Sequence, residues 1–197
     1  MGMWEEWDKL SNTSERGKKM RKQKGFSLIE LLIVVAIILI IAAIAVPNLL
    51  RSRMAANEAS AASALRTLGT ANITYSSTYN IGFAGVLAHL GLPVGAPVAT
   101  SSSDLLDSVL SGINPPTATP IKSGYMFTYA APNAAPTPAT PNGTFGIEAT
   151  PTAAGSSGTS TFCMDMGNVV LRDPLGSAPS VAAIGCAAFA AAAGVPM

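Results

Sequence analysis

The chain has 197 residues and a formal net charge of +1, with 12% charged and 49% hydrophobic residues. This balance predicts no specific nucleic-acid site, because such sites depend on a basic surface. Two cysteines and a single histidine, His89, are too few for a four-ligand zinc site. No glycine-rich phosphate-binding loop with a lysine occurs either. We therefore expect neither a metal nor another cofactor.

An almost unbroken apolar segment follows a basic cluster. From Leu31 to Val46 no charged or strongly polar residue occurs. Extended to Phe26 and Leu50, the segment has about 25 residues, and about 20 suffice to span a bilayer as a helix. The positive-inside rule keeps the basic end in the cytoplasm and places the remainder outside it. The basic residues are Lys18, Lys19, Arg21, Lys22 and Lys24.

A single carboxylate, Glu30, lies inside this segment. A charge within a membrane segment costs about 2.5–3.5 kcal/mol on insertion scales and is usually functional. Glu30 therefore calls for a partner of opposite charge. The simpler alternative is that an acid in the first turn of a helix complements the helix dipole.

Two plain interpretations of the segment remain open. A secretory signal peptide would be cut after its apolar region, where Ala42, Ala43 and Ala45 offer small residues. The run is longer than the roughly 7–15 residues typical of such a region. A simple signal anchor accounts for everything except Glu30 and the Gly25-Phe26 junction.

The stretch Lys24-Gly25-Phe26-Ser27-Leu28-Ile29-Glu30 and its apolar continuation resemble the N-terminal segment of type IV pilins and pseudopilins. The resemblance is close from about Lys24 to Arg53. It implies that a membrane peptidase cuts after Gly25 and that the new N-terminal residue, Phe26, is N-methylated. The mature helix would then become the spine of a filament. One departure is Leu39, where similar proteins often carry glycine; it affects how closely helices approach.

The resemblance also implies roles for Glu30 and Pro47. In a filament core the Glu30 carboxylate would meet the α-amino group of Phe26 on a neighbouring subunit, which sets the register between helices. Charge attraction is strong in such a core, although desolvation offsets much of it. Pro47 removes a helical hydrogen bond and predicts a bend, or the end of the membrane helix. The implied partners are copies of this chain, the prepilin peptidase/methylase, the inner-membrane assembly platform and minor pilins.

Residues 1–25 are predicted to be a leader that is removed from the mature protein. Met20 is an alternative translation start, since Met20 to Gly25 would be a sufficient leader. From Phe26 onward the chain has five basic and seven acidic residues and is mildly acidic.

Residues 26–79 are predicted to form one long helix, transmembrane to about residue 50 and amphipathic after it. Alanine is a strong helix former and is abundant in the second half. The helical spacing of the apolar residues predicts that this half packs against a head domain. The predicted packing face comprises Leu50, Met54, Ala61, Leu65, Leu68 and Tyr75.

Residues 80–197 are predicted to form a globular head, with a loop region at 80–123 and a β-sheet at 124–175. A short helix is expected at 103–110, capped by serine or aspartate. Alternating side chains predict antiparallel strands, and residues 130–142 read as an exposed loop. The strands are expected at 124–129, 144–150, 159–164 and 168–171. The fold class is therefore α+β, a long N-terminal helix with a small antiparallel sheet on its C-terminal half.

Cys163 and Cys186 are the only cysteines. If the head lies outside the cytoplasm, an oxidising environment favours a disulfide between them. The resemblance supports this pairing, because many type IV pilins have a C-terminal disulfide loop. Two buried thiols are the alternative.

Other candidate sites carry weaker signals. Asn72 and Asn142 begin glycosylation patterns, but such short motifs occur by chance. Asp165 and Asp173 flank a hairpin and supply oxygen ligands for calcium, without a dense carboxylate cluster. The apolar context of His89 favours a structural histidine over a catalytic base. The alanine-rich tail at 187–197 either packs on the sheet or lies loosely at the surface.

The sequence as a whole predicts a structural protein and not an enzyme. The first hypothesis is a type IV pilin-like subunit that lies in the bacterial inner membrane as a single-pass protein before assembly. After assembly it would form an extracellular or periplasmic filament for adhesion, motility or DNA uptake. The alternative is a pseudopilin of a type II secretion system. A third hypothesis, from another class, is a tethered enzyme or binding domain that never polymerises.

Overall fold

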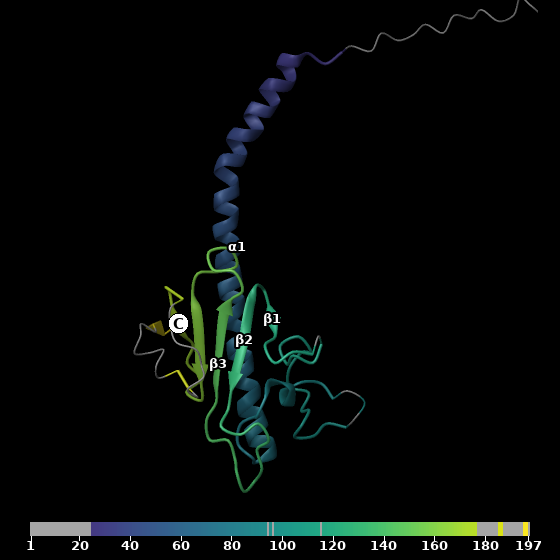
Figure 1. Cartoon of the computed structure of the whole chain (residues 1–197), viewed down its shortest axis with the longest axis vertical. Helices are drawn as coiled ribbons and strands as arrows, with labels where there is room; N and C mark the ends of the chain where they lie inside the picture. The colour runs from purple at the N-terminus through teal and green to yellow at the C-terminus, as the bar shows by residue number, and fades with distance from the viewer. Residues whose placement is uncertain are drawn as a thin grey trace, which may run out of the picture. The chain divides into compact units, whose positions relative to one another are not determined.

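The computed structural model describes residues 25–93, 95, 97–114, 116–176, 185–186 and 195–196. The chain divides into two compact units, one ending at Ile44 and the other beginning at Ala45. One helix, α1, runs from Leu28 to Tyr79 and contributes to both units (Figure 1).

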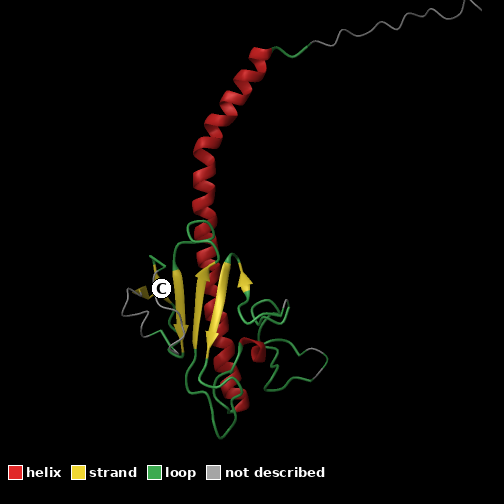
Figure 2. Cartoon of the chain, in the orientation of Figure 1, coloured by secondary structure: helices red, strands yellow, loops and turns green. Residues whose placement is uncertain are grey.

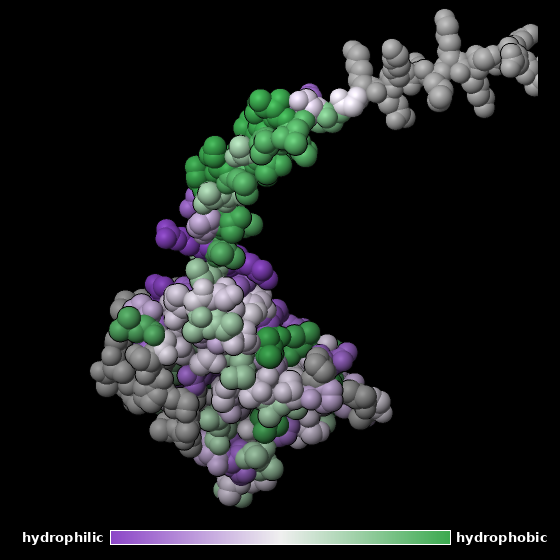
Figure 3. Space-filling view, turned by 45° about the horizontal axis from the view of Figure 1, so that its top comes forward, coloured by the Kyte–Doolittle hydropathy of each residue, from purple (hydrophilic) through white to green (hydrophobic). Residues whose placement is uncertain are grey.

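The described part of the first unit is an apolar helix with exposed side chains. Its isoleucine, leucine and valine side chains are between 44% and 76% exposed, and they form the continuous green segment in Figure 3. A helix that is apolar on every side is typical of a membrane span or a packed core. By length and composition α1 could cross a membrane.

In the second unit, the C-terminal part of α1 packs against a sheet. Ala61, Leu65, Leu68 and Tyr75 are all buried, as their helical spacing predicts. Gly69 allows the close approach, because a Cβ there would lie 2.5 Å from Met164 Cε. Leu50 was expected on this face but is 49% exposed. The packing face therefore begins later along the helix than predicted.

The sheet is an antiparallel meander with strand order β1-β2-β3-β4-β5-β6 among the described residues (Figure 2). This arrangement confirms the predicted α+β fold, a long helix with an antiparallel sheet packed on it. The strands are β1 (Ile121–Lys122), β2 (Tyr125–Ala130), β3 (Gly146–Pro151), β4 (Thr161–Asp165), β5 (Leu171–Asp173) and β6 (Val195–Pro196).

Cross-strand neighbours on one face of the sheet supply much of the core. Phe127, Ala149 and Phe162 are paired in register across β2, β3 and β4, and each is fully buried. Ile147 and Met164 form the next row, also fully buried. Side chains two positions apart on a strand lie on the same face. The alternation seen in the sequence therefore identifies the core face correctly.

The predicted helix at 103–110 is wrong. Its amides bond to a different segment: Ser103 N donates to His89 O, and Leu105 N and Leu106 N donate to Leu90 O. These carbonyls belong to a short 3-10 helix, η1 (Leu87–Leu90), which the sequence did not reveal. Asp107 does cap locally, since its Oδ1 accepts the amides of Val109 and Leu110. It caps a turn and not a helix.

The predicted strand at 168–171 is displaced, because β5 begins at Leu171. The turn before it is longer than expected. Asp165 Oδ1 accepts the Gly167 amide and the Asp165 carbonyl accepts the Asn168 amide. Asn168 has a φ of 56°, which interrupts an extended chain. Of the tail, β6 pairs with β5, whereas residues 187–194 and 197 lie outside the described residues.

Candidate functional site

The predicted cleavage junction is open in the structure. Residues 25–27 have no regular secondary structure, and the Leu31 amide bonding to Ser27 O is the first helical bond. Phe26 is 77% exposed. Apart from Gly25 and its chain neighbours, no described atom lies within 4 Å of the position that a Cβ on Gly25 would take. On the side that the structure describes, the Gly25-Phe26 bond is therefore exposed and outside the helix. The leader, residues 1–24, lies outside the described residues.

Glu30 lies in the first turn of α1 and is exposed. It forms no ion pair with any residue that the structure describes. Its surroundings along the helix are apolar and equally exposed. A carboxylate in this position complements the helix dipole and is available to a cation from outside the chain. The contact between Glu30 and Phe26 of a neighbour stays a prediction.

Pro47 lies inside α1, and the helix continues without a break on both sides of it. Proline has no amide hydrogen, so the carbonyl four residues earlier, that of Ala43, loses its helical donor. The bend expected at Pro47 stays a prediction.

Glu58 links α1 to residues that lie more than 100 positions later in the sequence. Its Oε1 accepts hydrogen bonds from Thr159 N (2.9 Å), Thr159 Oγ1 (3.0 Å) and Ser160 N (3.1 Å). Its Oε2 pairs with Arg172 Nη2 at 3.1 Å. Arg172 Nε also donates to Ser160 Oγ at 3.0 Å. These contacts join α1 to the start of β4 and to β5.

The chemistry of Glu58 follows from these partners. Burial by itself raises the Glu58 pKa, but the bonds from Thr159 and Ser160 and the charge of Arg172 outweigh it. The Glu58 pKa therefore lies below its usual value, and the group stays ionised near neutral pH. Sequence reasoning missed this cluster, since more than 100 residues separate Glu58 from its partners.

A buried amide network holds the loop region on α1. Asn72 is fully buried; its Oδ1 accepts hydrogen bonds from Tyr129 Oη (3.0 Å) and Ala84 N (3.2 Å). Asn142 is 1% exposed, and its Nδ2 donates to Asn133 O at 2.7 Å. Both asparagines begin glycosylation patterns, but a buried and bonded amide nitrogen cannot accept a glycan in the folded head. Burial also raises the Tyr129 pKa, so its hydroxyl stays protonated.

A disulfide joins Cys163 of β4 to Cys186, with their Cα atoms 5.9 Å apart. Both half-cystines are 2% exposed and pack against Leu171. Asp165 contributes to the same attachment, because its Oδ2 accepts the Cys186 amide at 3.2 Å. The other carboxylate oxygen of Asp165, Oδ1, accepts the Gly167 amide in the turn between β4 and β5. Both oxygens of Asp165 therefore have structural partners. The described residues contain no cluster of three or more candidate metal ligands.

His89 lines a small cavity of about 170 Å³ with Tyr75, Thr100, Ser101, Ala135 and Pro136. Its Nδ1 is buried without a hydrogen-bond partner in the described structure. Burial lowers the His89 pKa. The described lining residues include hydroxyls but no acid, so the acid of a catalytic triad is missing from this cavity's described lining.

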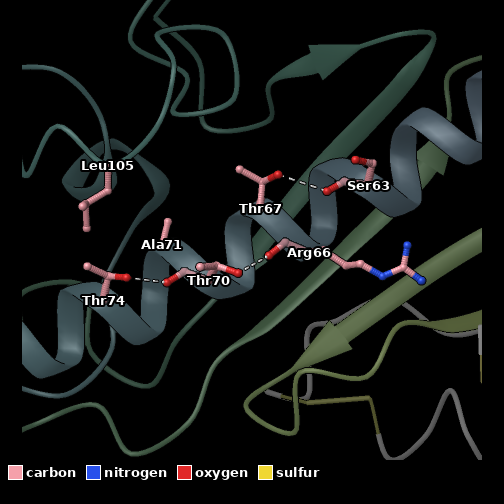
Figure 4. Close-up of a pocket in the computed structure, with 7 residues that line it drawn as sticks. All are labelled: Ser63, Arg66, Thr67, Thr70, Ala71, Thr74 and Leu105. Carbon is pink, nitrogen blue, oxygen red and sulfur yellow. Dashed lines mark hydrogen bonds between the residues drawn. The ribbon is translucent and has the colours of Figure 1, made fainter.

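A groove of about 380 Å³ runs along the exposed face of α1 in the head (Figure 4). It is lined by Ser63, Arg66, Thr67, Thr70, Ala71, Thr74 and Leu105. The hydroxyls of Thr67, Thr70 and Thr74 donate to carbonyls one turn earlier on the same helix. They are therefore turned toward the backbone and do not converge on a common point in the groove.

Comparison with known families bears on the N-terminal segment. Residues 20–46 match the family model described as the prokaryotic N-terminal methylation motif. This motif is the type IV pilin and pseudopilin signature. It includes the Gly25-Phe26 junction, Glu30 and most of the apolar segment. Comparisons with curated proteins and with solved structures give no match.

The match confirms, over residues 20–46, the resemblance seen in the sequence. It supports a type IV pilin-like or pseudopilin subunit, that is, a structural component. It also implies processing by a prepilin peptidase and polymerisation into filaments. Together with the apolar helix, it fits membrane anchoring before assembly.

Proposed function

We propose that this chain is the structural subunit of a type IV pilus-like filament. It is processed after Gly25, methylated at Phe26 and polymerised through its N-terminal helix. The observation that carries the proposal is the exposed apolar half of α1 directly behind an accessible cleavage junction. So large an apolar surface must be shielded from water by an apolar partner. The membrane supplies it before assembly, and copies of the same helix supply it in the filament.

Glu30 gives this packing a defined register. Apolar helices alone slide past one another at small energetic cost, because isoleucine, leucine and valine repeat along α1. A buried ionic contact is best attested as a device that fixes register. Cleavage creates the cation it needs, the α-amino group of Phe26. Processing therefore switches on assembly by exposing a charge as well as by removing the basic leader.

The head supplies the outer surface of the filament. Its disulfide suits an oxidising compartment. This supports a head that lies on the extracytoplasmic side of the inner membrane and later in an extracellular or periplasmic fibre. Adhesion, motility and DNA uptake are the roles that such a fibre serves. A pseudopilin of a type II secretion system would share the same N-terminal motif and the same assembly chemistry.

The test compares two charge-removing substitutions on the same helix. Glu30→Gln removes the register contact, and surface-sheared filament falls by roughly tenfold or more, the effect of about 1.4 kcal/mol. Glu58→Gln, the matched control, weakens the head but leaves the assembly helix intact, so sheared material stays near the wild-type level. Immunoblots of sheared and membrane fractions measure both. Unchanged shedding by Glu30→Gln contradicts the proposal and favours a tethered domain.

A further inference from the structure

Two arginines directly follow the apolar segment of α1. Arg51 and Arg53 are exposed, and neither forms an ion pair with a described residue. Among the described residues of the head, Lys122 pairs with Asp107 and Arg172 pairs with Glu58. The positive-inside rule favours few cations on the outer flank of a membrane span. Neither the head's ion pairs nor the expected orientation therefore accounts for this arginine pair.

The spacing of the two arginines says what kind of partner they fit. Residues two apart on a helix are rotated by about 200° and face opposite ways. Figure 3 shows hydrophilic atoms on both sides of the helix just beyond the apolar segment. A single docked protein would contact one of these sides. The fitting partner carries negative charge around the whole circumference of the helix.

Phospholipid headgroups meet this requirement at the right distance along the chain. The helix from Leu28 to Leu50 is roughly 34 Å long, slightly more than the hydrocarbon core of a bilayer at about 30 Å. Arg51 and Arg53 then reach the headgroup layer on the outer side. The planar guanidinium forms paired hydrogen bonds to phosphate oxygens.

We propose that Arg51 and Arg53 bind the phosphates of outer-leaflet phospholipids and hold the subunit at a fixed depth before assembly. This inference rests on the proposed function, since it requires a subunit that waits in the membrane. The basic cluster at the other end of the apolar segment engages the inner leaflet, and cleavage after Gly25 removes it. After processing, the two arginines are the cationic side chains that remain beside the apolar segment. Entry into a filament then requires that they release their lipid phosphates.

The test measures contact between arginine and lipid phosphorus. The full chain, with ¹³C at the arginine ζ-carbons, is placed in phosphatidylethanolamine and phosphatidylglycerol vesicles in a phosphate-free buffer. Solid-state NMR then records dephasing of the arginine carbons by lipid ³¹P. The double variant Arg51→Gln, Arg53→Gln is expected to lose the share of dephasing that these residues contribute. Arg66→Gln, the control on the same helix, keeps the wild-type dephasing.

Flotation of the vesicles separates the possible failures. A chain that does not float with the vesicles contradicts the proposed function and this inference together. A chain that floats, with equal dephasing in the wild type and the double variant, overturns only the assignment of the arginines. If that double variant also loses sheared filament, the arginines serve contacts between subunits instead.

Discussion

The two halves of α1 have similar helical structure but opposite surroundings. In the C-terminal half, Leu65 and Leu68 are fully buried beneath the sheet, whereas Leu31 and Leu32 in the N-terminal half are each 59% exposed. The same residue type therefore stabilises the folded head in one half and remains available for packing in the other. This difference teaches that stability and assembly are separable along a single helix, and the following substitutions test that separation.

The largest expected difference is between a buried and an exposed leucine. Leu68→Ala should lower the free energy of unfolding of the head by about 2–5 kcal/mol, since it leaves a cavity under the sheet. Leu32→Ala should leave it unchanged within about 0.5 kcal/mol. Denaturant unfolding of the detergent-solubilised chain, followed by the near-ultraviolet signal of the head tyrosines, measures both. An equal loss of unfolding free energy in both variants would contradict the claim that only the C-terminal half of α1 stabilises the head.

Removal of the disulfide should have the next largest effect. Cys163 and Cys186 are 23 residues apart, and their bond closes a loop that begins in β4 and contains β5. Cys163→Ser with Cys186→Ser should cost about 3 kcal/mol of head stability in the chain-entropy model. Thermal unfolding of the wild type with and without reductant provides the matched comparison. A melting temperature that reductant does not change would show that the disulfide does not stabilise the head.

Glu58→Gln should cost about 1–2 kcal/mol, because charge-assisted hydrogen bonds contribute more than neutral ones. The dependence on pH has a defined sign. The Glu58 pKa is lowered in the folded head, so its stabilisation is complete above the unfolded value near 4.5 and is lost as the pH falls below it. Urea unfolding at a series of pH values should therefore show that the free energies of unfolding of the wild type and the variant become equal in acid. A difference in the free energy of unfolding that does not change with pH would refute the role of the ionised carboxylate.

The smallest expected effect concerns His89. Burial lowers its pKa, so the unfolded chain binds a proton more readily than the folded head. Stability should then decline as the pH falls below about 6.5, the unfolded value, toward the folded pKa. His89→Gln should flatten this decline while changing stability near pH 8 by less than about 1 kcal/mol. If both proteins lose stability in parallel between pH 7 and 5, another group is responsible.

Local patterns were sufficient for much of the fold. The continuous apolar run and the alanine-rich continuation predict α1, and the alternation around Phe127 predicts β2 and its buried face. Such signals lie within one element. The failed helix at 103–110 had a local signal too, but its amides bond to carbonyls of η1 and the residue after it. Tertiary hydrogen bonds there overrode helix propensity.

The candidate site likewise contains residues that a local motif predicts and contacts between distant elements that it does not. Gly25, Phe26 and Glu30 lie close together in the sequence, so a short motif was enough to predict them, and the family match covers all three. The attachment of Glu58 to Thr159 and Arg172 depends on residues from distant elements. Sequence spacing carries no signal for such a contact. The buried states of Asn72 and Asn142 likewise required the packed head.

The most direct test is the N-terminal residue of the mature protein, determined by mass spectrometry of surface-sheared material. A chain that begins with N-methylated Phe26 would establish processing after Gly25 and export into a filament, as the account predicts. An intact leader, or cleavage near Ala45, together with no protein in the sheared fraction would contradict it. The apolar half of α1 would then be a simple anchor or a discarded signal segment.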